Sequence, residues 1–285
     1  MRRVDYLIDD ARLSTNTKDI EAITKYLCIH FLNKAQSFLQ SLIFTQNNEA
    51  KIFGGEITFY LVPGIDSYQL PFDIYARNSV NNVSYVVENG SSKYYSRIPC
   101  ISEKNRGGAS GYFTSDNKII FSPLPTQAHK VSISYNKKIP TLGIRHGKII
   151  TVNTNTSLVL DAGYTLMTDV DDFFTVVDKD GKIIKSGIEV NQTTDTLTVS
   201  DTSDILVGHY VVPGKYSTTH SRLPDECEAA LISALQKFIV ARMSSNDLPI
   251  EKAFSDEFMQ SVAALFAEND GDAMMPPVTE YSEWF

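Results

Sequence analysis

The sequence has few of the residues that secreted disulfide proteins and metalloproteins depend on. Its three cysteines are Cys28, Cys100 and Cys227. They are too few and too widely spaced for a disulfide scaffold, so synthesis in a reducing compartment is expected. No Cys-x-x-Cys pair and no His-Glu-x-x-His stretch occurs, so the common zinc motifs are excluded. We therefore expect neither a metal nor a cofactor.

Long apolar runs are missing as well. No run reaches the roughly 18 to 20 residues that cross a bilayer, so no membrane contact is expected. The first residues become acidic at Asp9 and Asp10 before any apolar segment develops, so the sequence predicts no signal peptide. With 42% hydrophobic and 21% charged residues, the chain has a globular composition.

An excess of positive charge is also absent. The 26 basic and 34 acidic residues give a formal net charge of −8. The first 220 residues hold 22 of each sign, so all the net charge comes from residues 221–285. The basic surface of a tight nucleic-acid binder is therefore lacking. An acidic, solvated helix pair accounts for this charge pattern.

The two ends of the chain have helical patterns. Residues 3–13 predict a short helix, and a longer one is expected over 18–44, capped by Asn16 or Thr17. At the other end, Pro224 followed by two carboxylates indicates a helix start, and the pattern continues as a hairpin over 224–267. Each helical segment has an apolar stripe that it cannot bury alone, so we expect them to pack together. The stripe of the longer N-terminal helix contains Ile23, Leu27, Phe31, Phe38 and Leu42.

The middle of the chain has β patterns. Short strands bounded by Gly, Pro, Asn or Ser are expected between 51 and 141, at 57–62, 73–75, 83–87, 118–121 and 131–135. Residues 142–220 are rich in Thr, Val, Asp and Gly and lack helical periodicity. Strands are expected there at 148–152, 158–160, 173–177, 182–185 and 196–199, with a hairpin turn in which Gly181 takes a positive φ.

The expected fold class is α+β. We predict N-terminal helices over 1–50, a β-domain over 51–141, an inserted β-sandwich or barrel over 142–220, and a C-terminal helical hairpin over 221–268. The N-terminal helices and the hairpin are expected to form one helical bundle. An extended tail over 269–285 follows, because its two adjacent prolines forbid a helix across them.

Catalytic motifs are missing. The Gly-rich stretch 106–111 lacks the lysine and the strand-to-helix setting of a phosphate loop. Asp178 and Asp180 lie in an acidic turn that lacks the distal glutamate of a calcium loop. No Ser–His–Asp or Cys–His set can be assigned from spacing, because such sets are defined by geometry. We nominate no catalytic residue and do not expect an enzyme.

A series of short motifs, in order, carries a resemblance. A helical pair leads to Phe59–Pro71, which reads FYLVPGIDSYQLP. The next motifs are Phe121–Pro125, which reads FSPLP, and Val131–Leu142. The last is Leu223–Glu226, which opens an Ala-rich helix. This order resembles the head-to-tail adaptor proteins of tailed bacteriophages, especially the short-tailed ones. The resemblance covers roughly 1–142 and 221–285, and residues 142–220 have no counterpart in the simplest members.

The resemblance implies a structural protein of the virion neck or tail, made in the host bacterial cytoplasm. Copies would assemble as a homo-oligomeric ring, expected to be a dodecamer, beneath the phage portal protein. The ring would extend the DNA channel, pass double-stranded DNA without sequence-specific binding, and contact other tail proteins or fibres. The matching residues, such as Gly64, Pro71, Pro125 and Pro224, would be structural.

Two other functions stay open from the sequence. Residues 142–220 could be a module that binds carbohydrate or a tail fibre through clustered aromatic side chains. The candidates are Tyr164, Phe173, Phe174, Tyr210 and Tyr216. Alternatively, the acidic loops could form a hydrolase site, which would need converging carboxylates in a pocket.

The tail carries the expected partner-binding residues Tyr281, Trp284 and Phe285. It holds the only tryptophan of the chain, next to a terminal phenylalanine. Trp and Tyr dominate interface hot spots, and aromatic side chains at an exposed end are costly to leave in water. We expect these residues to become ordered on the portal or on an adjacent subunit.

Overall fold

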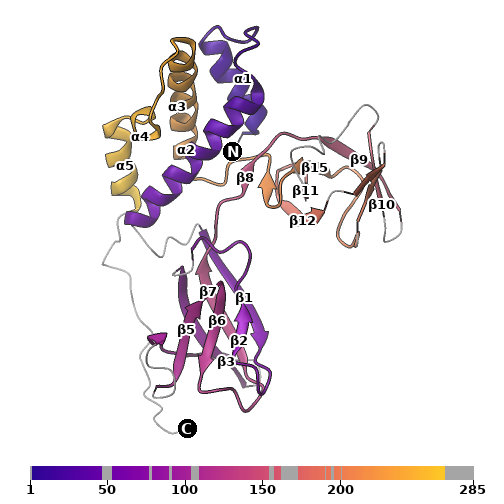
Figure 1. The fold of residues 1–285 in the computed structure, drawn as a ribbon, viewed down its shortest axis with the longest axis vertical. Coiled ribbons are helices and arrows are strands. Elements are labelled where there is room, and N and C mark those ends of the chain that lie inside the picture. The colour runs from indigo at the N-terminus through magenta and orange to yellow at the C-terminus, as the bar shows by residue number, and fades with distance from the viewer. Residues whose placement is uncertain are drawn as a thin grey trace.

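The computed structural model describes residues 2–46, 53–76, 79–89, 92–103, 109–153, 157–161, 173–189, 191–193, 196–199 and 201–266. It is a mixture of helices and strands, as the α+β prediction requires. Figure 1 shows three parts: a helical unit, a middle β-unit below it, and a second β-unit to its side, which we call the insert.

The helical unit combines both ends of the chain. Buried apolar residues of its long helices share one core cluster, to which α1 and α4 also contribute. Phe31 is 4% exposed and its ring stacks on Phe238 with 4.2 Å between centroids. The N-terminal and C-terminal helices therefore pack against each other in this core. The helices are α1 (Val4–Ser14), α2 (Lys25–Gln46), α3 (Glu226–Met243), α4 (Ile250–Ala253) and α5 (Asp256–Phe266).

The long N-terminal helix starts later than the sequence suggested. Neither Asn16 nor Thr17 caps it, because α2 begins at Lys25 and a series of turns precedes it. Asn16 has φ 54°, in the left-handed region, and ends the turn after α1. The capping contact comes from Thr24 instead, whose Oγ1 accepts a hydrogen bond from the N–H of Leu27 at 3.1 Å.

The middle β-unit consists of two antiparallel sheets on one apolar core. One sheet has the order β1-β7-β3-β4 and the other β2-β6-β5. Strands β5 and β6 flank the Asp116–Asn117 turn, where both residues take a positive φ. The strands are β1 (Gly54–Tyr60), β2 (Ser67–Gln69), β3 (Val80–Asn89), β4 (Ser92–Arg97), β5 (Gly111–Ser115), β6 (Lys118–Ser122) and β7 (Lys130–Asn136).

The strand expected at 73–75 is wrong. Ile74 forms only an isolated bridge with Lys137, and the neighbouring residues lie outside any strand. Asp73 is held by side chains: the hydroxyl of Tyr135 donates to its Oδ1 at 2.9 Å, and the Lys137 ammonium lies 3.8 Å from Oδ2. These contacts join residues more than sixty positions apart, so no local pattern predicts them.

The insert forms one sheet of seven strands with the order β12-β11-β15-β9-β10-β14-β13. This curled half-barrel encloses its own apolar core. Of the two expected forms, a β-sandwich or a barrel, this single curled sheet agrees with the barrel; two sheets on one core occur in the middle β-unit. The strands are β9 (Gly147–Asn153), β10 (Ser157–Leu160), β11 (Phe173–Val177), β12 (Ile183–Glu189), β13 (Asn191–Thr193), β14 (Thr196–Thr198) and β15 (Tyr210–Pro213).

The predicted hairpin turn between β11 and β12 is confirmed. The N–H of Asp178 donates to the carbonyl of Lys182 at 3.0 Å, and Gly181 has φ 74°. Gly181 is needed for a second reason, because a Cβ there would lie 2.3 Å from Nδ1 of His220. The glycine thus allows the turn to lie against the segment that leaves the insert.

The chain enters and leaves the insert at one place. β8 (Thr141–Leu142) and β16 (Ser217–Thr218) pair in parallel at this junction. Figure 1 shows β8 between the helical unit and the two β-units. All three units therefore meet within a few residues of this strand pair.

Candidate functional site: a polar hub and an open groove

Three amide side chains on one face of α2 bind the segment that joins the three units. Asn33 pairs with both backbone groups of Leu142: its Oδ1 accepts from the N–H at 2.6 Å, and its Nδ2 donates to the carbonyl at 3.0 Å. Gln40 donates to the carbonyl of Lys137 at 2.8 Å and accepts from the N–H of Ile139 at 3.2 Å. Side chains of the helix thus form hydrogen bonds with the backbone of residues 137–142, as a neighbouring β-strand would do with its own backbone.

Gln36, between the two other amides, extends the contact to the segment that follows β16. Its Nε2 donates to the carbonyl of Pro140 at 2.9 Å. Since proline has no N–H, the Oε1 of Gln36 needs another donor, and the Ser221 hydroxyl supplies it at 3.2 Å. Gln36 is 2% exposed, so its amide is satisfied inside the protein. We call Asn33, Gln36 and Gln40 with their backbone partners the polar hub.

A second set of contacts ties the insert to the start of α1. The N–H of Val4 donates to the carbonyl of Thr219 at 2.9 Å. The carbonyl of Gly181 accepts from the guanidinium of Arg222 and from the Thr218 hydroxyl, both at 2.6 Å. The Arg145 guanidinium lies 3.9 Å from the centre of the Tyr210 ring.

Burial and clustered positive charge shape the electrostatics of this region. Burial lowers the pKa of Arg145, and the nearby Arg3 lowers it further. Burial and Arg145 also lower the pKa of His220. His146, which follows Arg145 in the sequence, is 6% exposed, and burial lowers its pKa to about 4. The imidazole of His146 is therefore neutral at pH 7, which suits a role in packing.

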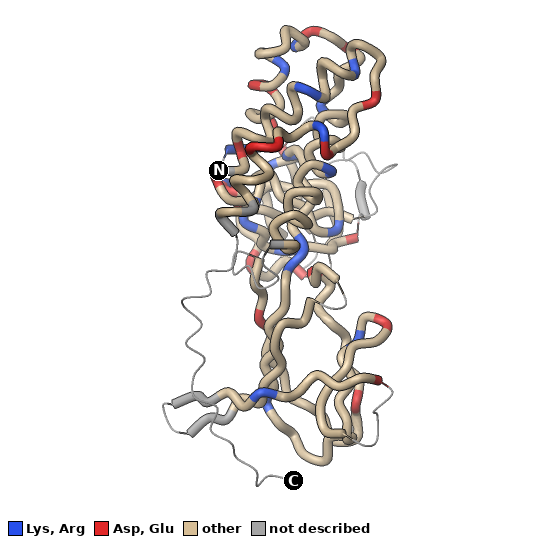
Figure 2. The backbone as a smooth tube through the Cα atoms, turned by 90° about the vertical axis from the view of Figure 1, so that its left-hand side faces the viewer, with Lys and Arg blue, Asp and Glu red and all other residues tan. Residues whose placement is uncertain are grey.

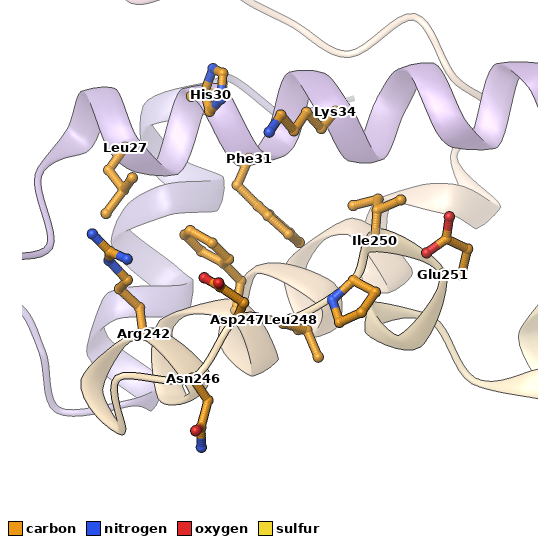
Figure 3. A pocket seen from close by; sticks show the side chains of 12 residues that line it. Leu27, His30, Phe31, Lys34, Arg242, Asn246, Asp247, Leu248, Ile250 and Glu251 are labelled. Atoms are coloured by element: carbon orange, nitrogen blue, oxygen red, sulfur yellow. The ribbon is translucent and has the colours of Figure 1, made fainter.

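An open groove lies on the other side of α2, between that helix and the chain around α4. Its volume is about 580 Å³. Leu27 and Phe31 project from α2 toward the groove, and Arg242 projects from α3 back toward Leu27 (Figure 3). The remaining lining residues are His30, Lys34, Phe238, Asn246, Asp247, Leu248, Pro249, Ile250 and Glu251.

The groove has an apolar floor and a charged rim. Leu27, Phe238 and Ile250 are only partly buried although they pack on the helical core. Lys34 and Arg242 are exposed, and within the described part of the chain neither side chain forms an ion pair or hydrogen bond. Asp247 and Glu251 add two carboxylates to the rim, so its positive charge is confined to Lys34 and Arg242. Such a surface suits a short peptide whose aromatic side chains lie on the floor and whose carboxylates meet these two cations.

Acidic and basic residues alternate along the helical unit (Figure 2). Residues 221–266 hold seven acidic and four basic residues. Most of the net charge of −8 therefore belongs to residues 267–285 rather than to the C-terminal helices.

Only some of the residues that the sequence nominated for a site lie within the described part of the chain. Tyr281, Trp284 and Phe285 lie outside the described residues. Asp169, Asp171 and Asp172, which belong to the acidic segments considered for a hydrolase site, also lie outside the described residues. Asp178 accepts hydrogen bonds from the N–H groups of Asp180 and Lys182, both at 2.8 Å, so it stabilises its own turn.

Of the five aromatic residues considered for a binding face of the insert, the four that the structure describes do not form one. Phe174 is fully buried in the core. The ring of Phe173 lies under Lys215, and Tyr210 lies under Arg145. Tyr216 packs edge-on against Phe72 of the middle β-unit. The last of the five, at position 164, lies outside the described residues.

Neither metal chemistry nor a membrane span gains support from the described residues. They contain no group of three or more His, Cys, Asp or Glu side chains placed to hold a metal ion. None of the described helices is both long enough and apolar enough to cross a bilayer. In comparisons with known proteins, no family model matches the chain, and no curated protein matches it either.

The polar hub is the part of the site that sequence reasoning missed. Asn33, Gln36 and Gln40 lie three and four positions apart, so they share one helix face with apolar neighbours. Amides at such spacing in a buried stripe are a signal that could have been noticed. Their partners lie between 97 and 185 residues away, so the sequence could not name them.

Proposed function

We propose that the protein is a virion structural protein that forms the head-to-tail adaptor ring of a tailed phage. The observation that carries this proposal is the polar hub. One face of α2 binds residues 137–142, where the middle β-unit ends and the chain continues toward the insert. The helical unit, built from both ends of the chain, therefore carries two separate β-units, which we call its arms. A subunit that must contact different neighbours at once needs such an arrangement.

In this proposal the helices form the bundle that makes up the body of the ring. The middle β-unit and the insert extend from it toward adjacent subunits, tail proteins or fibres. The hub fixes the directions of both arms, because Gln36 and Gln40 are buried and all three amides have partners for their oxygens and nitrogens. The insert would lie on the outside of the ring.

The ring would be a dodecamer beneath the portal and would conduct DNA toward the tail. A conduit must not hold the DNA that slides through it. The excess of carboxylates after residue 220 supports this role, since negative charge repels phosphates. Tyr281, Trp284 and Phe285 would act as anchors on the portal or on a neighbouring subunit.

The test is assembly with the cognate portal protein. We expect size-exclusion chromatography with light scattering, followed by electron microscopy, to show a ring of this protein attached to the portal. A variant with Asn33→Leu and Gln40→Leu, whose arms are no longer fixed, should attach poorly while retaining helical circular dichroism. The proposal fails if wild-type protein stays monomeric with and without the portal.

A further inference from the structure

We propose that the groove between α2 and the chain around α4 binds residues 280–285 from the tail of a second copy of this protein. This inference rests on the proposed ring, because a ring supplies a neighbour whose tail can reach the groove. The contact between the tail and the groove would join neighbouring subunits.

The groove has the properties of a peptide-binding surface. Its volume of about 580 Å³ falls within the range of roughly 300 to 1,000 Å³ in which small ligands bind. Leu27, Phe238, Leu248 and Ile250 keep apolar surface exposed in it while resting on the core. The stacked pair Phe31 and Phe238 provides a rigid aromatic wall.

The end of the tail has the complementary chemistry. Trp284 and Phe285 are adjacent aromatic anchors, and two carboxylates, Glu280 and Glu283, precede them. Residues 269–285 contain no Lys or Arg, so no basic side chain there offsets these carboxylates.

The groove rim offers partners for these groups. Lys34 and Arg242 are exposed on opposite walls, and within the described residues neither has an anionic partner. The tail would bury its aromatic side chains on the apolar floor of the groove. Its carboxylates would at the same time pair with Lys34 and Arg242.

The length of the chain allows the tail to reach another subunit. The chain from α4 to α5 packs on the C-terminal half of α2: Phe254, which precedes α5, stacks on Phe38 with 5.6 Å between centroids, and Phe258 of α5 stacks on Phe254. The thirteen residues between Phe266 and Glu280 can span at most about 45 Å when extended. In a ring each subunit would give one tail and receive one, which is a head-to-tail contact that closes on itself.

The groove is tested first with a peptide. A labelled peptide of residues 273–285 is titrated onto protein truncated after Asp272. We expect saturable binding that weakens at least tenfold when Trp284 and Phe285 of the peptide are replaced by alanine. Lys34→Glu with Arg242→Glu in the protein should weaken it at least fivefold. The matched control is Lys237→Glu on the exposed side of α3, which should leave binding unchanged.

The inference is overturned if the peptide does not bind at 1 mM, or if the groove variants bind it as well as wild type. Circular dichroism of each variant confirms that its helices have folded.

A mixing experiment decides whether the contact joins two copies. One variant keeps the tail but carries Lys34→Glu and Arg242→Glu, and the other keeps the groove but is truncated after Asp272. Neither should self-associate, and the mixture should give a one-to-one complex by light scattering. If the peptide binds but the mixture stays monomeric, the tail does not join two copies and the proposal of a second copy is wrong.

These experiments need no portal protein, so they separate the two proposals. A one-to-one complex without portal attachment would support the tail contact and contradict the adaptor function. Portal attachment by the truncated protein would support the adaptor function and show that this contact is dispensable for it.

Discussion

Phe31 shows how one side chain joins the two ends of the chain. It is 4% exposed and stacks on Phe238 of α3. We expect Phe31→Ala to reduce the free energy of unfolding by about 3 to 5 kcal/mol, since the change removes a buried ring and leaves a cavity. Urea unfolding at pH 7.5 measures this loss. Tyr26→Ala, at a position 55% exposed on the same helix, is the control and should cost less than about 0.5 kcal/mol.

His146 links stability to pH. Burial lowers its pKa to about 4 in the folded protein, compared with 6.5 when it is exposed. Between these values the unfolded chain binds the extra proton and the folded one does not, so stability is full above pH 6.5 and falls as the pH drops toward 4. We expect this residue to account for a loss of about 1 to 3 kcal/mol over that range.

Urea unfolding of the wild type and of His146→Gln at several pH values between 7.5 and 4.5 checks this. The variant should lose less stability than wild type as the pH falls. Other groups with lowered pKa values, such as Asp5 and Glu228, remain in both proteins and cancel in the comparison. Equal pH profiles would show that His146 is not responsible.

The element that organises the molecule is α2. Its buried Gln36 bonds to Pro140 and Ser221, on the segments that enter and leave the region of the insert. We expect Gln36→Ala to cost about 1 to 3 kcal/mol, because a buried carbonyl and hydroxyl lose their partner. Ser37→Ala, exposed on the same helix, should be within about 0.5 kcal/mol of wild type. Thermal unfolding distinguishes the pair, and equal effects would contradict the importance of the hub.

The insert has a core of its own, which makes it separable. Its apolar cluster shares no residue with that of the helical unit. Leu142 belongs to the helical core, so a deletion should preserve the strand pair β8 and β16. We expect a variant in which a short Gly-Ser linker replaces residues 144–216 to keep the circular dichroism of its helices and a cooperative thermal transition, while losing assembly with tail proteins.

Failure of this variant to fold would mean that the insert is part of the main folding unit. The contacts of Gly181 with Arg222 and Thr218, which the deletion removes, are the ones that would then be responsible.

For the whole molecule, the decisive change is removal of the tail. Truncation after Asp272 should leave the monomer's midpoint of thermal unfolding within about 2 °C of the full chain, because the residues of the helical core cluster all precede the cut. Association between copies should be lost. Differential scanning calorimetry at low protein concentration and light scattering at high concentration measure the two effects. A large fall in monomer stability with normal assembly would mean that the tail stabilises its own subunit.

The sequence by itself determined the local structure wherever a pattern repeats within a few residues. Apolar spacing predicted a helix at 3–13, and α1 spans Val4–Ser14. It also predicted strands that lie within β6, β7 and β11, and the turn at Gly181. These elements follow from periodic burial and from the conformational freedom of glycine, which a short stretch of sequence records.

Only the tertiary structure decided where those elements meet. The start of α2 depends on turns that Asn16 and Thr24 stabilise, and the absence of a strand at Asp73 depends on Tyr135 and Lys137. The polar hub and the groove combine residues from distant parts of the chain. Hydrogen bonds between an amide side chain and a backbone about a hundred residues away leave no periodic signal, so folding alone brings them together.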